Sequence, residues 1–396
     1  MISLLTVAGS ACQKNDPGPD SDEWTPEAEK NLYVSSTLLA SASLPELQAA
    51  TTQDNALYRN EVKYDVDIYK LVYTTTYQGK AIQASGLVCV PKGMSTPAPI
   101  LSMQHGTIFA EQEAPSHYER LSDQQLLASA GYVTLIPDYI GFGESKQIFH
   151  PYFDQRHSAL AVIDMIKAAK LLCKEKDVAL NDKLFLTGYS EGGYVTLAAQ
   201  QEIETNAVHG LKVTASAAGA GGYDVLGLVG MVTSGVPYYF PVSIAYLLQA
   251  YNYTYTWHRP LTDMFQNPYA SELPKLFNGV NTGMAINEKL PQDIRKLLSP
   301  TFYAALQDNS QELRLKRALY VNSFPEWTPQ SPTRLYHGTN DIIIPFQNSK
   351  ETYQRFVAQG AKKTEFIPVE DGTHESAYKP MMQSVVPWLK SFSSKQ

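Results

Sequence analysis

Short apolar runs recur along the chain and are separated by stretches whose apolar residues fall at helical spacing. The runs predict β-strands near residues 99–104, 131–137, 183–187, 211–218, 333–337 and 363–369. Two of the intervening segments predict helices, over about 157–174 and 377–392. Strands that alternate with helices in this way predict an α/β domain with a mostly parallel sheet flanked by helices on both faces.

Two longer stretches precede this alternation. Residues 66–77 and 80–91 are rich in Val, Tyr, Thr and Ile, and Gln78-Gly79 separates them. This composition around a Gly-containing turn predicts an antiparallel hairpin that opens the sheet.

The alternation is interrupted between residues 223 and 330, where more than one hundred residues separate two predicted strands. A connection of this length is far longer than an ordinary loop. Its first part is aromatic, with several tyrosines and Trp257 between 237 and 257, and residues 284–320 have helical periodicity. We expect a helical cap in which most aromatic side chains pack within the cap and some face a cleft.

Residues 183–198 carry the pattern Gly-x-Ser-x-Gly, with Ser190 between Gly188 and Gly192. An apolar strand precedes the serine and an apolar helical face follows it. A sharp strand-to-helix turn with small flanking residues exposes the serine hydroxyl, which a nucleophile requires. The first N–H groups of the helix, beginning at Glu191, are free to bind a developing negative charge.

A nucleophilic serine needs a base and a carboxylate that orients it, and both follow at later strand ends. The strand at 333–337 leads into a loop with Asp341, and the strand at 363–369 leads into a loop with His374. Asp371, three residues before His374, and Asp138, after an earlier strand, are competing acids. The order Ser190, Asp341, His374 is the one used on the α/β-hydrolase fold.

On these motifs, residues 60–394 resemble the α/β-hydrolase superfamily, and within it the secretory lipases and esterases with a long helical insertion before the acid-bearing strand. The resemblance implies a core over 36–222 and 331–396 and a cap over 223–330. It implies catalytic Ser190, Asp341 and His374, with Asp341 preferred because its His-Gly-x-x-Asp loop matches the family's acid position.

The resemblance also implies two backbone donors for an oxyanion. The first is the N–H of Glu191, and the second comes from the loop after strand 99–104, where we assign Thr107 and keep Gly106 as the near alternative. In that loop, His105 is expected to orient the backbone rather than to act as a second base. The stretch from Asp138 to Ser145 lacks the features of a phosphate loop and is expected to be structural.

The expected activity is hydrolysis of carboxylic esters through an acyl-enzyme, with a small-molecule, lipid or glycan ester as substrate. The same triad can cleave amides, so a serine exopeptidase is an alternative. The cap contains Glu272, Glu288 and Glu326 but no adjacent acidic pair to hold a peptide amino terminus. A non-catalytic binding protein of the same fold would normally lack a triad member, and all three are present.

Composition restricts the partners. The formal net charge of −7 and the absence of a basic run argue against nucleic-acid binding. The three cysteines, Cys12, Cys89 and Cys173, have neither metal-ligand nor redox spacing, and their odd number argues against a disulfide framework. We expect no metal and no cofactor.

The amino-terminal residues suggest export. Residues 2–11 form a short apolar run that ends in small residues before Cys12, and acidic, polar residues follow. This segment, residues 1–12, fits the end of a secretory signal and resembles a bacterial lipoprotein cleavage site. We expect an exported protein, attached to a membrane through lipidated Cys12 in the periplasm or at the cell surface, or secreted. Residues 13–35 are expected to form a flexible tether.

Overall fold

The computed structural model describes residues 32–51 and 56–393. Within these residues, a 9-stranded sheet with the order β1-β2-β3-β5-β4-β6-β7-β8-β9 runs through the molecule. Its strands are β1 (Tyr33–Ala42), β2 (Val66–Tyr77), β3 (Lys80–Pro91), β4 (Ala98–Gln104), β5 (Val133–Pro137), β6 (Leu180–Tyr189), β7 (Ala215–Gly219), β8 (Thr333–Gly338) and β9 (Thr364–Val369).

Six consecutive strands of this order, from β5 to β9, pair in parallel. The predicted hairpin is confirmed, because β2 and β3 pair antiparallel from Val66↔Pro91 to Tyr77↔Lys80. The expectation that it opens the sheet is wrong, since β1 pairs outside β2 as an antiparallel edge strand. β1 begins at Tyr33, so the predicted tether over residues 13–35 overlaps the first residues of this strand.

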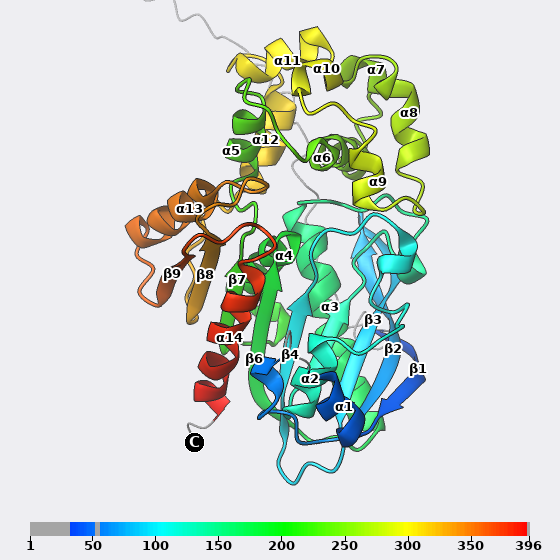
Figure 1. Ribbon diagram of the computed structural model, residues 1–396. Coiled ribbons are helices and arrows are strands. Elements are labelled where there is room, and N and C mark those ends of the chain that lie inside the picture. Colours follow the sequence, from blue (N-terminus) through cyan, green and yellow to red (C-terminus); the bar gives the residue numbers. More distant parts are fainter. Residues whose placement is uncertain (1–31, 52–55, 394–396) are drawn as a thin grey trace, which may run out of the picture.

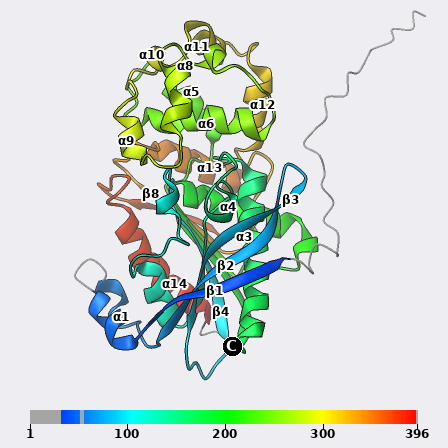
Figure 2. The same cartoon turned by 90° about the vertical axis from the view of Figure 1, so that its right-hand side faces the viewer.

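Helices cover both faces of the sheet, as the alternation of strands and helices predicted, and Figure 2 shows them on opposite sides. One apolar core contains residues of α3, α4 and α13, and a second contains residues of α1, α2 and α14. Among the helices of the described residues, none has the length and apolarity needed to cross a membrane. The bounds are α1 (Leu44–Ala50), α2 (Asp123–Ser129), α3 (Gln155–Glu175), α4 (Glu191–Thr205), α13 (Phe346–Ala358) and α14 (Tyr378–Ser393), with short 3-10 turns η2 (Ala56–Tyr58), η3 (Glu111–Glu113), η4 (Gly143–Ser145) and η5 (Ala207–His209).

The long connection between β7 and β8 is helical and lies above the sheet in Figure 1. We call this connection, residues 220–332, the cap. Its first helices pack against the same apolar core as α3 and α4, through side chains such as Leu228 and Leu247. The cap helices are α5 (Val225–Val232), α6 (Pro241–Thr254), α7 (Leu261–Met264), α8 (Tyr269–Leu276), α9 (Gly283–Asn287), α10 (Ile294–Leu297), α11 (Pro300–Gln307) and α12 (Leu313–Val321).

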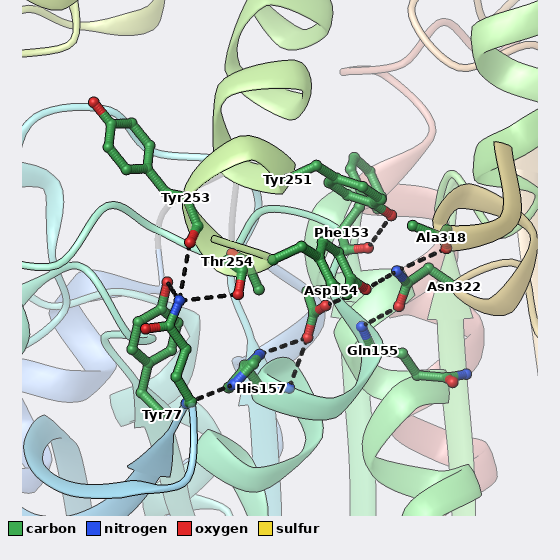
Figure 3. A network of polar contacts seen from close by, with 12 residues as sticks. Tyr77, Phe153, Asp154, Gln155, His157, Tyr251, Tyr253, Thr254, Ala318 and Asn322 are labelled. Carbon is green, nitrogen blue, oxygen red and sulfur yellow. Dashed lines mark hydrogen bonds and ion pairs between the residues drawn. The ribbon is translucent and has the colours of Figure 1, made fainter. Parts of the chain in front are cut away.

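Hydrogen bonds tie the ends of α6 and α12 to the core below them (Figure 3). The Tyr251 hydroxyl donates to the carbonyl oxygen of Phe153 at 3.0 Å. The Tyr255 hydroxyl donates to Asp154, the residue that caps α3, at 2.8 Å. Asn322, just after α12, accepts from the backbone N–H at the start of α3 at 2.8 Å. Because side chains rather than loops alone make these links, the cap has a defined position over the sheet.

At the turn from β6 into α4, the helix backbone lies in close contact with the backbone of the sheet. A Cβ at Gly188 would clash with the carbonyl oxygen of Gly192, and a Cβ at Gly192 would clash with that of Gln104. At Gly193, a Cβ would clash with the carbonyl oxygen of Gly219. Backbone atoms cannot move aside as a flexible side chain can, so α4 reaches this position only with glycine at all three places.

The substitution Gly192→Ala is expected to lower the free energy of unfolding by about 2 kcal/mol or more, because the methyl group forces α4 away from β4. Gly230→Ala is the matched control, since Gly230 lies in α5 and a Cβ there meets nothing within 4 Å. The control is expected to be neutral or to stabilise the protein by about 0.5–1 kcal/mol through helix propensity. Urea unfolding midpoints measure both changes, and equal midpoints for the two variants would contradict the steric argument.

Candidate active site

Ser190 lies at the turn between β6 and α4, and its backbone is held in an uncommon conformation. Its φ is 58° and its ψ is −128°, in a region that residues with a side chain rarely adopt. Its N–H donates to the carbonyl oxygen of Gly219 at the end of β7, at 2.9 Å. The backbone N–H of Gly193 donates to the Ser190 carbonyl oxygen, also at 2.9 Å, and this bond begins α4. The side chain therefore projects from the carboxyl end of the sheet, where ligands of open α/β sheets bind.

The structure brings Ser190, His374 and Asp341 together in one chain of hydrogen bonds. His374 Nε2 lies 2.9 Å from Ser190 Oγ, and His374 Nδ1 lies 2.7 Å from Asp341 Oδ2. An ionised carboxylate only accepts hydrogen bonds, so Nδ1 carries the proton and Nε2 presents its lone pair to the serine hydroxyl. This is the arrangement in which an imidazole can take a proton from the serine.

Asp341 is buried and held by several donors. The backbone N–H groups of Ile343 and Ile344 both donate to its Oδ1 at 2.9 Å. His337 Nε2 lies 3.1 Å from Oδ2, the same oxygen that His374 contacts. Burial by itself raises the pKa of Asp341, but hydrogen bonds from His337 and His374 outweigh it and lower the pKa to about 2. The carboxylate is therefore ionised at neutral pH.

The two competing acids lie elsewhere. Asp138 is buried, and its oxygens accept from the Ser85 hydroxyl at 2.6 Å and from the Ser116 N–H at 2.8 Å. It holds the loops after β5 and β4 together, as expected for a structural residue. Asp371 is solvent-exposed, and its own N–H donates to Thr339. Geometry thus favours Asp341 as the partner of His374.

The loop after β4 approaches the serine from the other side. A Cβ placed on Gly106 would lie 3.6 Å from Ser190 Cβ, so this backbone is close to the hydroxyl. His105 stacks on Tyr139 with ring centroids 4.1 Å apart, and its Nδ1–H donates to the Gly106 carbonyl oxygen at 2.7 Å. The Tyr139 hydroxyl donates to the His105 carbonyl oxygen at 2.9 Å. His105 therefore holds the loop, while Gly106 and Thr107 both border the cavity around Ser190.

A buried hydrogen-bonded pair beside the serine was not foreseen from the sequence. His150 Nε2 lies 2.6 Å from Glu191 Oε1, and these side chains are only 3% and 2% exposed. His150 Nδ1–H donates to the Ile140 carbonyl oxygen at 2.7 Å. Glu191 was predicted as a backbone donor, and its side chain locks the first residue of α4 in place. Forty-one positions separate the partners in the sequence, so no local pattern links them.

A cavity of about 470 Å³ surrounds the serine. Its walls come from both parts of the chain, with Ser190 and His374 from the core and Tyr238, Phe240 and Leu247 from the cap. The expectation that some aromatic residues of the cap face a cleft is therefore confirmed. Other aromatic residues of the cap, such as Tyr246 and Tyr251, are buried. Tyr239 and Tyr253 are exposed, and so are the apolar side chains of Val280 and Met284.

Comparisons with known proteins agree with this architecture. The chain is 27% identical over 293 residues to Lipase 4 of Candida albicans, an alignment that covers 70% of this chain and 58% of that lipase. The chain thus spans 58% of the length of this relative. Among solved structures, it resembles a hydrolase of Legionella pneumophila with a TM-score of 0.79 and 25% identity, covering 92% of this chain and 99% of that one.

Two further solved structures have the same fold. The rice cell wall degrading esterase LipA of Xanthomonas oryzae matches with a TM-score of 0.78 and 25% identity, over 92% of this chain and 98% of LipA. Lipase A of Candida antarctica matches with a TM-score of 0.64 and 18% identity, over 88% of this chain and 79% of that lipase. The predicted α/β-hydrolase fold is confirmed by these neighbours. A model of the secretory lipase family matches residues 116–396, and the chain therefore belongs to that family.

Proposed function

We propose that the protein is a serine hydrolase that cleaves carboxylic esters through a covalent acyl-enzyme. The observation that carries this proposal is the hydrogen-bonded chain from Ser190 through His374 to Asp341. Membership of the secretory lipase family supports it. The cavity around the serine, with walls of apolar and aromatic side chains, suits an ester substrate.

In the first step, Ser190 Oγ attacks the ester carbonyl carbon while its proton passes to His374 Nε2. Asp341 keeps the imidazole in the required tautomer and stabilises its positive charge. The tetrahedral intermediate collapses, the bond to the alcohol oxygen breaks, and Nε2 returns the proton to that oxygen. A water molecule then attacks the acyl-enzyme by the same route, and the carboxylic acid leaves.

The developing oxyanion is stabilised by backbone N–H groups. Glu191 is the first residue of α4, so its N–H has no partner within the helix and is directed by the buried His150–Glu191 pair. The second donor is Thr107, with Gly106 as the alternative, since both border the cavity beside Ser190. Removal of one such donor in other serine hydrolases costs about 10²–10³-fold in turnover.

Two other functions remain as alternatives to ester hydrolysis. A serine exopeptidase of this fold would need carboxylates near the serine to bind a peptide amino terminus. Glu375 borders the cavity, whereas Glu272, Glu288 and Glu326 of the cap do not. A binding protein without catalysis is disfavoured by the intact contacts between Ser190, His374 and Asp341.

We also propose that the protein is exported and anchored through a lipid on Cys12, which lies outside the described residues. Membership of the secretory lipase family supports export. If Cys12 is lipidated, the protein purified from its native host enters the detergent phase, and Cys12→Ser shifts it to the aqueous phase. Phase partitioning followed by immunoblotting measures this, and a wild-type protein found only in the aqueous phase would rule out the anchor.

Ser190→Ala is expected to abolish labelling by a fluorophosphonate probe and to lower ester hydrolysis roughly 10⁶-fold, with an equally deep loss in His374→Ala, because the residues act as a unit. Ser310→Ala, at an exposed position in the cap, is the matched control and keeps wild-type labelling. Activity-based labelling and kcat/KM on a short-chain ester measure the outcome. Wild-type turnover in Ser190→Ala would refute the proposed function.

Asp341→Asn is expected to lower kcat about 10⁴-fold without unfolding the protein, because an amide stabilises the wrong imidazole tautomer. Asp371→Asn, the matched change at the exposed neighbouring acid, is expected to alter kcat about threefold or less. Steady-state kinetics and circular dichroism of both variants provide the comparison. A larger loss in Asp371→Asn than in Asp341→Asn would move the orienting acid to Asp371.

A further inference from the structure

The cavity around Ser190 reaches both sides of the sheet. We call the part under the cap the cap lobe, bordered by Leu228, Tyr238, Phe240, Ile244 and Leu247. The other part, the core lobe, is bordered by Met103, Gln124, Thr187, Tyr189, Tyr378 and Met382. Apart from the polar Gln124 and Thr187, the residues of the two sets lie in or against different apolar cores, which supports the division.

The polar groups of the cap lobe have protein partners. The Tyr238 hydroxyl donates to the Ile343 carbonyl oxygen and lies 3.1 Å from Ser243 Oγ. Tyr152, which also borders the cavity, has its hydroxyl 3.2 Å from Thr107 Oγ1. With its hydroxyls engaged and its remaining surface aliphatic or aromatic, the cap lobe suits a hydrocarbon group.

The core lobe differs, because two of its hydroxyls have no hydrogen-bond partner among residues 32–51 and 56–393. Thr187 is 1% exposed, and neither its Oγ1 nor the buried Tyr189 hydroxyl makes a hydrogen bond. The nearby Tyr378 hydroxyl, in contrast, donates to Asp123 at 2.9 Å and joins α14 to α2. An unpaired buried hydroxyl costs about 1–3 kcal/mol, so two of them at one cavity wall indicate a polar ligand.

The Thr187 and Tyr189 hydroxyls lie on the side of the cavity from which the alcohol leaves. Thr187 and Tyr189 lie on the same face of β6, since side chains alternate along a strand. The Tyr189 ring lies beside the His374 ring, with centroids 5.5 Å apart. His374 must protonate the departing alcohol oxygen, so the alcohol portion of the substrate lies on the His374 side of the reacting carbon.

We propose that the core lobe binds the alcohol portion of the ester and that the Thr187 and Tyr189 hydroxyls bind hydroxyl groups on it. The preferred substrates are then esters of short polyols or sugars, with the acyl chain in the cap lobe. This inference rests on the proposed ester hydrolysis and specifies its substrate class. A hydroxyl both donates and accepts, so either residue can satisfy a substrate hydroxyl.

The test compares two esters of the same size and acyl group. Glyceryl monobutyrate carries two free hydroxyls, and its hydrocarbon isostere has methyl groups in their place. The wild-type protein is expected to favour the glyceryl ester in kcat/KM. Thr187→Val removes one hydroxyl at nearly constant volume and is expected to lower this preference about 3- to 10-fold, the effect of one lost hydrogen bond. Tyr189→Phe is expected to lower it similarly.

Two control variants separate substrate contact from packing. Thr187→Ser keeps the hydroxyl and is expected to retain the preference. Thr352 in α13 is equally buried, its Oγ1 likewise has no partner, and it does not border the cavity, so Thr352→Val is expected to retain it too. Tyr189→Phe carries the test if Thr187→Val does not fold.

The outcomes distinguish this inference from the proposed function. If the wild-type protein hydrolyses both esters but Thr187→Val and Tyr189→Phe keep the wild-type preference, the core lobe does not bind the alcohol and the inference is wrong. If the wild-type protein hydrolyses neither ester, the proposed function fails together with the inference. If Thr352→Val lowers the preference for the glyceryl ester as much as Thr187→Val does, the cause is a general packing effect. That result would also overturn the inference.

Discussion

The close packing of α4 against the ends of β4 and β7 is the constraint on which the rest of the site depends. Backbone atoms of Gln104 and Gly219 occupy the space that a Cβ at Gly192 or Gly193 would need. This packing holds Ser190 at a positive φ, a conformation that costs of the order of 1–3 kcal/mol. The surrounding sheet and helix supply that energy, so the serine hydroxyl has a fixed position within reach of His374.

Two buried carboxylates flank this turn, and both are paired with histidines. Asp341 accepts from His374 and lies beside His337, while Glu191 pairs with His150. A buried carboxylate without a partner would cost several kcal/mol, so each pair is a structural requirement as well as a chemical resource. The first pair fixes the His374 ring beside Ser190, and the second fixes the N-terminus of α4, where the proposed mechanism places the oxyanion.

The cap completes the site from a distant part of the chain. Its insertion between β7 and β8 places it over the carboxyl ends of the strands, where Ser190 and His374 lie. The links from Tyr251 and Tyr255 to the start of α3 hold it in that position. The aromatic residues of the cap therefore have two tasks, to form an apolar core for the cap and to enclose the cavity around Ser190.

The sequence by itself determined the parts that depend on local patterns. Apolar periodicity identified every strand from β2 to β9 to within a few residues, and the order of Ser190, Asp341 and His374 indicated the fold family. The strand β1 was missed because most of its side chains are exposed and their pattern does not alternate, so it forms only through pairing with β2.

Only the tertiary structure decided which distant groups meet. The sequence favoured Asp341 only through the family resemblance and offered Asp371 and Asp138 as competing acids, whereas in the structure Asp371 is exposed and Asp138 already binds Ser85 and Ser116. The His150–Glu191 pair and the unpaired Thr187 hydroxyl were likewise absent from any motif. The physical reason is that burial and hydrogen-bond partners depend on the packing of separate segments, whereas sequence periodicity reports only which face of one segment is apolar.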